Sequence, residues 1–104
     1  MLQKVTDESF HDEVREAEQP VVVLFKATWC NPCKEFTPLV EDLAGKMTGF
    51  KFVTIDLDES PKTTGDMAIR TVPSLALFND GMVRDVLVGR HPKQEVRHWI
   101  NDNH

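Results

Sequence analysis

The sequence predicts an α/β fold in which a mixed β-sheet of about five strands is flanked by four helices. The run Val21–Phe25 is apolar and mostly β-branched, which is typical of a central strand buried on both faces. Apolar residues at helical spacing follow each of the first predicted strands, and such alternation indicates parallel neighbours. The tripeptide Asn79-Asp80-Gly81 between two further strands predicts a hairpin and therefore an antiparallel end of the sheet.

The first half of the chain supplies two strands and two helices. Residues 2–5 predict a short edge strand, and Thr6 and Asp7 are good capping residues for the helix that follows. Pro20 ends this helix, whose apolar face is Phe10, Val14 and Ala17. The strand over 21–25 leads into a segment with two cysteines and then into a second helix, which Pro38 is expected to kink. The inner face of the second helix is Phe36, Leu39, Val40, Leu43 and Met47.

The second half supplies three strands and two helices. Residues 50–55 predict a third strand that closes at Asp56, and Ser60 and Pro61 begin a short helix through Ala68. The hairpin strands cover 75–78 and 82–88. Pro92 fits the first turn of the last helix, whose inward residues are Val96, Trp99 and Ile100.

Length and composition indicate one globular domain over residues 1–104. The chain has 104 residues, of which 40% are hydrophobic and 28% charged, an ordinary balance for a domain that buries its own core. The net charge is −5 and the basic residues form no block, so nothing favours nucleic-acid binding. The N-terminus lacks a signal-peptide pattern and the longest apolar run is too short to span a bilayer, so we expect a cytoplasmic protein.

The two cysteines, Cys30 and Cys33, lie between a predicted buried strand and the helix that follows it. A cysteine at a helix N-terminus faces unpaired N–H groups and the positive end of the helix dipole, and both lower the pKa of its thiol. If Cys30 is the N-cap, the N–H of Cys33 can reach its sulfur. We therefore expect an exposed Cys30 that attacks a target disulfide and a more buried Cys33 that resolves the mixed disulfide.

Two other interpretations of the cysteine pair are a structural zinc site and an inert pair in the core. A structural zinc site needs two further Cys or His ligands, and no spaced histidine pair accompanies the cysteines. The histidines are His11, His91, His98 and His104. An inert pair of core cysteines is disfavoured because the flanking Trp29, Pro32 and Lys34 suit a surface turn. We predict no metal.

The order and spacing of several segments resemble the thioredoxin family over nearly the whole chain. The matching segments are the WCNPCK sequence of residues 29–34, Pro38, the RTVPS sequence of residues 70–74, Asn79-Asp80-Gly81, and Val88-Gly89. This resemblance implies the thioredoxin fold, a central mixed sheet flanked by helices. It also implies a cis peptide bond between Val72 and Pro73 beside the cysteines, a positioned feature because cis bonds are uncommon.

The resemblance further implies a substrate-docking surface and a set of partners. In the family, the loop before the cis proline offers its backbone to an extended substrate chain. The substrate-binding residues here would be Trp29, Thr71, Val72, Pro73, Val88 and Gly89, with Arg90 beside them. The implied partners are disulfide-containing proteins and a flavin- and NADPH-dependent thioredoxin reductase. No bound cofactor is needed, because the dithiol carries the electrons, and we expect a monomer.

Three positions depart from the family pattern close to the cysteines. Asn31, next to Pro32, stands where glycine is usual, and its amide is expected to tune the redox poise. Leu24 stands six residues before Cys30, where the family buries an aspartate, and Phe52 stands in place of the accompanying lysine. Because the acid is thought to help deprotonate the resolving cysteine, we expect slower resolution, or loss of the Cys33 proton through water or substrate. Loss of a buried ionisable pair is also expected to stabilise the fold by ~1–4 kcal/mol or leave it unchanged.

A fourth departure is Lys26, where an aromatic residue is common. One interpretation pairs it with Asp56 as a partly exposed ion pair worth roughly 0–1 kcal/mol, with a positive charge that favours the Cys30 thiolate. The other interpretation is a solvated surface lysine.

The leading functional prediction is a protein disulfide reductase that serves cell redox homeostasis and electron transport. A disulfide oxidant or isomerase of the same fold is disfavoured because oxidising relatives tend to carry His between the cysteines. A binding subunit with unused cysteines is the alternative from another class, since the fold alone does not exclude it. The retained set of Cys30, Cys33 and Pro73 argues for active chemistry.

Overall fold

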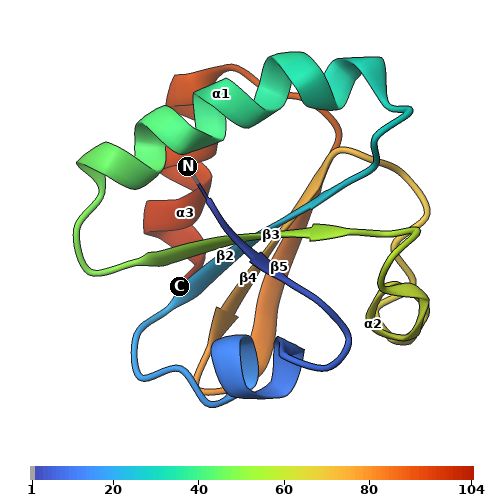
Figure 1. Cartoon of the computed structure of the whole chain (residues 1–104). Helices are drawn as coiled ribbons and strands as arrows, with labels where there is room; N and C mark the ends of the chain where they lie inside the picture. Colours follow the sequence, from blue (N-terminus) through green and yellow to red (C-terminus); the bar gives the residue numbers. More distant parts are fainter. Residues whose placement is uncertain (1) are drawn as a thin grey trace.

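The computed structural model describes residues 2–104 and has the predicted α/β architecture (Figure 1). Within these residues, one five-stranded sheet has the strand order β1-β3-β2-β4-β5. The strands are β1 (Gln3–Val5), β2 (Val21–Lys26), β3 (Lys51–Asp56), β4 (Ser74–Asn79) and β5 (Met82–Val88). The helical segments are η1 (His11–Arg15), α1 (Asn31–Lys46), α2 (Pro61–Asp66) and α3 (Lys93–Asn103).

The sheet is mixed, as the sequence predicts. β1 and β2 both pair with β3 in parallel, whereas β4 runs antiparallel to both β2 and β5. The β4–β5 hairpin turns through Asp80 and Gly81, whose φ angles of +55° and +77° are both left-handed, as a two-residue primed turn requires. Glycine is also demanded by space, because a Cβ at Gly81 would lie 2.8 Å from the carbonyl oxygen of Arg15.

The helices cover both faces of the sheet, so the central strand is buried on each side. α1 and α3 lie together on one face, and η1 and α2 lie on the other (Figure 1). Alternate residues of β2 serve the two layers: Val22 and Leu24 pack under α1 and α3, and Val21, Val23 and Phe25 pack on the opposite side. This two-sided burial explains why β2 reads as a continuous apolar run.

The segment after β1 differs from its prediction. Residues 11–15 form a single π-helical segment, and the Asp7 side chain caps a different helix. Its carboxylate accepts hydrogen bonds from the backbone N–H groups of Lys62 (3.1 Å) and Thr63 (2.8 Å) at the start of α2. These bonds, that from Thr63 first, lower the pKa of Asp7. α2 ends at Asp66 rather than Ala68, because Ala68 adopts a left-handed φ of +55°.

The two long helices match their predicted positions and inward faces. α1 continues through Pro38 and buries Phe36, Val40 and Leu43, while α3 buries Val96, Trp99 and Ile100. The indole Nε1–H of Trp99 donates to Asp85 Oδ2 at 2.7 Å and thereby ties α3 to β5.

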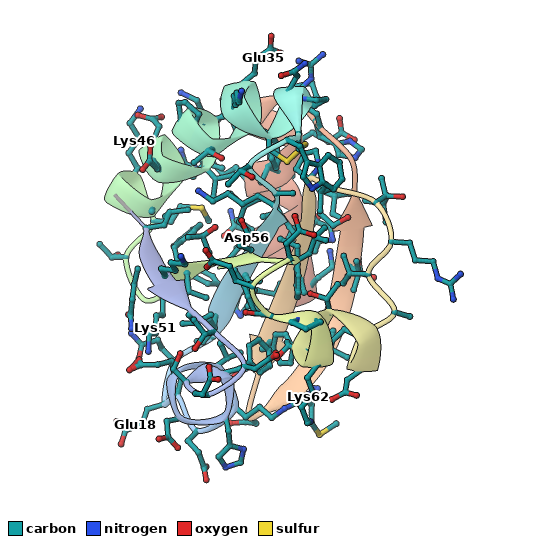
Figure 2. All side chains as sticks on the ribbon, turned by 45° about the vertical axis from the view of Figure 1, so that its right-hand side comes forward. Glu18, Glu35, Lys46, Lys51, Asp56 and Lys62 are labelled. Carbon is teal, nitrogen blue, oxygen red and sulfur yellow. A yellow bond between two sulfur atoms is a disulfide. The ribbon has the colours of Figure 1, made fainter. Side chains whose placement is uncertain are left out.

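Charged side chains lie mostly on the outside of the molecule. Glu18, Glu35, Lys46 and Lys62 point away from the body of the protein (Figure 2) and are exposed. Asp56, at the end of β3, differs because it is only 7% exposed. In the part of the chain that the structure describes, no helix is long and apolar enough to cross a membrane.

Candidate active site

Cys30 and Cys33 form a disulfide at the point where β2 leads into α1. Their Cα atoms are 5.3 Å apart. A tight turn follows β2, in which the N–H of Cys30 donates to the Ala27 carbonyl at 3.2 Å. Cys30 has an extended backbone and is the N-cap of α1, and the N–H of Cys33 donates to Cys30 Sγ at 3.1 Å. The predicted N-cap geometry is therefore confirmed, and it places a backbone donor on the sulfur of Cys30.

The expected exposure of Cys30 is wrong for the disulfide form. Cys30 is 4% exposed and Cys33 is 2% exposed, so the two sulfurs hardly differ. Cys30 is covered because it packs in a small cluster with Ala27, Leu57 and Val72. Its Sγ also lies 3.6 Å from the Val72 carbonyl oxygen, which can accept a hydrogen bond from the reduced thiol.

The loop that contains Pro73 lies against the cysteines. The Val72–Pro73 bond is cis, as the resemblance implied. Ser74 Oγ donates to the Thr71 carbonyl at 2.6 Å, and the N–H of Gly89 donates to the Pro73 carbonyl at 2.8 Å. The second bond holds the loop after β5 beside the proline loop. The structure thus brings the residues of the predicted docking surface from both loops to one place.

The predicted docking surface is apolar and partly open. Val88 is 55% exposed and Trp29 is 64% exposed, as expected for contact residues, and Thr71 is exposed beside them. Val72 is half-buried and Pro73 is buried, so they offer backbone more than side chain. Such solvent-exposed apolar groups around a reactive centre are typical of a protein-binding surface.

Several contacts around this surface were missed at the sequence level. The indole Nε1–H of Trp29 donates to Asp58 Oδ2 at 2.8 Å, and Arg90 forms an ion pair with Glu35 of α1. The His91 ring lies within hydrogen-bond distance of the Val88 carbonyl oxygen (2.8 Å from Nε2). In the sequence, only the acidic residues after β3 point to the hydrogen bond of Trp29, and they do not reveal which carboxylate accepts it.

Leu24 and Phe52 are both part of the core. Leu24 is fully buried in β2, and Phe52 is 8% exposed in the neighbouring strand. Both belong to the apolar cluster beneath α1 and α3, which also contains Phe36. The two positions at which the family pattern has an acid and a lysine are therefore occupied by buried hydrocarbon in this chain.

The proposed ion pair between Lys26 and Asp56 is absent. The two residues are partners in the β2–β3 register, yet no salt bridge joins them among residues 2–104. Asp56 Oδ1 instead accepts the backbone N–H groups of Asp58 (2.8 Å) and Glu59 (3.2 Å). The carboxylate is turned toward the loop after β3 because two backbone donors there would otherwise lack partners.

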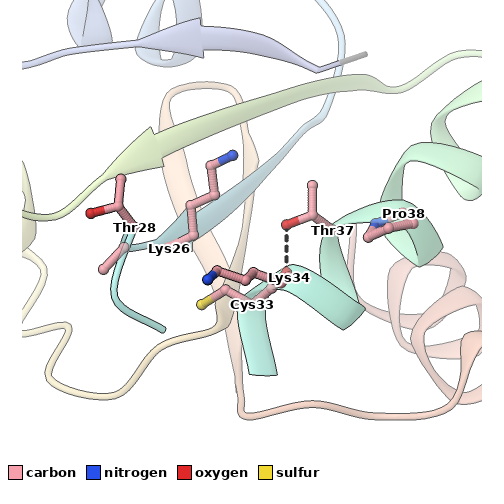
Figure 3. Close-up of a pocket in the computed structure, with 7 residues that line it drawn as sticks. Lys26, Thr28, Cys33, Lys34, Thr37 and Pro38 are labelled. Carbon is pink, nitrogen blue, oxygen red and sulfur yellow. Dashed lines mark hydrogen bonds between the residues drawn. The ribbon is translucent and has the colours of Figure 1, made fainter. Parts of the chain in front are cut away.

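A shallow pocket of about 420 Å³ opens beside Cys33 (Figure 3). Lys26 and Thr28, from the end of β2, face residues of the first turns of α1 across this pocket. Thr37 Oγ1 donates to the Cys33 carbonyl at 2.7 Å and so fixes one wall. Its lining residues are Lys26, Ala27, Thr28, Cys33, Lys34, Thr37 and Pro38. Asn31 and Pro32 are exposed at the first two positions of α1, outside this lining.

The site contains no second set of metal ligands near the cysteines. Across residues 2–104, no group of three or more His, Cys, Asp or Glu side chains could hold a metal ion. The geometry is instead suited to thiol–disulfide exchange, because two sulfurs within bonding distance at a helix N-terminus can open and close one disulfide.

Comparison with known proteins agrees with this chemistry. The family model described as Thioredoxin matches residues 1–102. The chain is 38% identical over 104 residues to a thioredoxin of Rickettsia bellii, with 99% of each chain covered, and 37% identical over 102 residues to a thioredoxin of Rickettsia prowazekii, with 97% of each covered. It is also 43% identical over 93 residues to the chloroplastic thioredoxin M2 of Arabidopsis thaliana, covering 88% of this chain and 50% of that protein.

Proposed function

This chain belongs to the thioredoxin family and is a thiol–disulfide oxidoreductase, and on that premise we propose that Cys30 is its attacking sulfur and Cys33 its resolving sulfur. The observation that carries this assignment is the hydrogen bond from the Cys33 N–H to Cys30 Sγ at the N-terminus of α1. The backbone donor and the helix dipole stabilise negative charge on Cys30 in particular.

The reaction consists of two exchanges. In the first, the Cys30 thiolate attacks one sulfur of a substrate disulfide, a mixed disulfide forms, and the other substrate sulfur leaves as a thiolate. In the second, the Cys33 thiolate attacks Cys30 Sγ, the Cys30–Cys33 bond forms, and the remaining substrate thiolate is released. Two electrons pass from the protein to the substrate, so a bound cofactor is not needed.

Substrate chains dock in extended form across the two loops next to the disulfide. The contact residues are Trp29, Thr71, Val72, Pro73, Val88 and Gly89, with Arg90 at the edge. The exposure of Trp29 and Val88 supports this surface, as does the hydrogen bond between Gly89 and Pro73 that holds the loops together. Backbone groups of the proline loop would give affinity for many sequences, as in recognition by strand addition.

The oxidised protein is returned to the dithiol by a thioredoxin reductase, and we place this cycle in the cytoplasm. The use of only two cysteines, both in the redox pair, suits a reducing compartment. The protein works as a monomer and as one domain. Within residues 2–104, its exposed large apolar side chains are Trp29, Met82, Val83 and Val88, and they form no extensive face.

Reduction of insulin by dithiothreitol tests the reductase activity and the two cysteine roles. The wild-type protein is expected to accelerate the reaction, and Cys30→Ser is expected to abolish the acceleration. With the Cys33→Ser variant, a mixed disulfide between Cys30 and a substrate chain should accumulate, because the first exchange proceeds without the second. Accumulation in Cys30→Ser instead of Cys33→Ser would reverse the assignment.

A further inference from the structure

The resolving step requires a thiolate at Cys33, and the core side of this residue does not favour one. Cys33 is 2% exposed and packs in an apolar cluster with Ala27, Leu57 and Val72. Burial among apolar groups disfavours the charged form of a thiol. Stabilisation of the Cys33 thiolate must therefore come from another side of the residue.

The pocket beside Cys33 provides a polar side. Lys26, Lys34 and Thr28 line the pocket together with Cys33. In Figure 3 the Lys34 nitrogen lies toward the Cys33 sulfur, and the Lys26 side chain extends upward with its nitrogen at the end farther from that sulfur. Among residues 2–104, neither lysine forms an ion pair, whereas Lys4, Lys46, Lys51, Lys62 and Lys93 all do. Two uncompensated positive charges thus share a water-accessible pocket with the buried thiol.

We propose that the Lys26 ammonium group stabilises the Cys33 thiolate across this pocket and that the Cys33 proton leaves to pocket water. In this step the S–H bond of Cys33 breaks and water carries the proton to solvent. The Cys33 thiolate then attacks Cys30 Sγ and displaces the substrate thiolate. The proposal rests on the resolving role of Cys33 argued above. An ammonium group is already protonated, so Lys26 acts through its charge and not as a base.

Lys26 is better suited to this task than Lys34. Lys26 is half-buried at the end of the rigid strand β2, whereas Lys34 is exposed on the surface of α1. A charge that is partly shielded from water and salt interacts more strongly with its neighbours. Figure 3 shows the Lys26 side chain within the space between Thr28 and Thr37, above Cys33.

The charges on the other side of Lys26 oppose its effect. A second pocket shares Lys26, Thr28 and Thr37 with the first and is also lined by charged residues. These are Lys4, Glu41, Asp56 and Glu59. Lys4 forms an ion pair with Glu59, whose hydrogen bond raises the pKa of Lys4. Asp56 is the buried carboxylate of this group, so its charge weakens the positive field of Lys26 at Cys33.

Titration of Cys33 in a Cys30→Ser background measures this effect without a second thiol. The thiolate absorbance of Cys33 is followed against pH. We expect Lys26→Met to raise the midpoint of ionisation by about one pH unit, the size of shift that one nearby charge produces. Lys26→Arg keeps the charge and is expected to leave the midpoint near its original value. Lys46→Met, at the far end of α1, removes the same charge at a distance and is the matched control.

An Asp56→Asn variant in the same background tests the opposing charge. Asparagine retains the oxygen that accepts the two turn N–H groups, so the loop after β3 is preserved. The proposal predicts a lower midpoint, because an opposing charge is removed. An unchanged or higher midpoint would show that the charges around this pocket do not govern the ionisation of Cys33 and would overturn the proposal.

Equal midpoints of Cys33 ionisation for Lys26→Met and Lys46→Met would also overturn the proposal. The result is separable from the cysteine assignment, because trapping of the mixed disulfide by Cys33→Ser depends on neither lysine.

Discussion

Cys30 and Cys33 share one disulfide, yet the groups that surround them come from different sources. The hydrogen-bond partners of the Cys30 sulfur are backbone groups: the Cys33 nitrogen lies 3.1 Å from it and the Val72 carbonyl oxygen 3.6 Å. Cys33 shares its apolar neighbours with Cys30 but also lines a pocket with Lys26 and Lys34. The backbone hydrogen bonds of Cys30 follow from the fold, whereas the charged residues in the pocket beside Cys33 depend on the sequence.

This difference between the two cysteines indicates which of the two environments can vary among relatives of this chain. Any chain that places a CxxC segment between a strand and a helix gives the first sulfur a backbone donor. The second sulfur receives whatever the adjacent strand and helix present. In this chain they present hydrocarbon from one direction and positive charge from another, and this combination makes the ionisation of Cys33 the adjustable step.

The largest effect is expected for Leu24→Asp, which places a carboxylate in the core strand that leads to the cysteines. Leu24 is 0% exposed. A carboxylate placed there without a partner is expected to reduce the free energy of unfolding by roughly 3–5 kcal/mol. The same variant is expected to reduce disulfides faster near neutral pH, because an acid next to Cys33 can take its proton. Urea denaturation and the insulin assay measure the two effects.

The double variant Leu24→Asp, Phe52→Lys is the control that gives the buried carboxylate a partner of opposite charge. A buried pair is less costly than a single buried charge, but apolar packing is still favoured, so we expect the double variant to be ~1–4 kcal/mol less stable than the wild type. A double variant as stable as the wild type would show that Leu24 and Phe52 do not stabilise the fold. An unchanged rate of the resolving step in Leu24→Asp would show that an acid at this position does not help to deprotonate Cys33.

A smaller effect is expected for Asp7→Ala, far from both sulfurs. Asp7 accepts two N–H groups at the start of α2, so its loss is expected to lower the urea midpoint modestly and leave insulin reduction unchanged. The pKa of Asp7 is lowered in the folded state. Its contribution is therefore complete above the unfolded pKa of about 3.9 and is lost as the pH falls through the lower folded value. Urea titrations of both proteins from pH 7 to pH 2 should show the stability difference narrowing on the acid side; a constant difference would contradict the capping role.

The sequence predicts those features that local patterns determine. The apolar run of β2, the Asp80–Gly81 turn and the capping position of Cys30 all follow from neighbouring residues, and each is confirmed. The cis bond before Pro73 came from the family resemblance, and the structure contains it.

Features that depend on side-chain direction over long sequence separations were not predicted. Asp7 caps a helix that begins more than fifty residues later, with a sequence separation of 55 to Lys62. Asp56 turns to the backbone of its own loop and not to Lys26, although the two are register partners. Cys30 is covered by Val72, a residue 42 positions away. In each case two or more partners were chemically possible, and only the packed chain selects between them.

The smallest effect is expected for Trp29→Phe, which tests the Cys30 side of the comparison. The variant removes the indole N–H that donates to Asp58 but keeps an aromatic ring at an exposed position. Because the hydrogen-bond partners of Cys30 Sγ are backbone groups and not the indole, the rate of the variant with a small disulfide should not change. In the proposed docking mode protein substrates contact the ring, so the KM for insulin is expected to rise about two- to fivefold, equivalent to ~0.4–1 kcal/mol, with kcat retained.

Asp58→Asn is the matched variant for this test, because it weakens the same hydrogen bond and leaves the indole in place. A similar rise in KM for both variants would show that the bond orients Trp29 for docking. If Trp29→Phe slowed the reaction with the small disulfide as well, the indole would act on Cys30 itself. The environment of the attacking sulfur would then depend on side chains as much as that of its partner, and the distinction between the two sulfurs would fail.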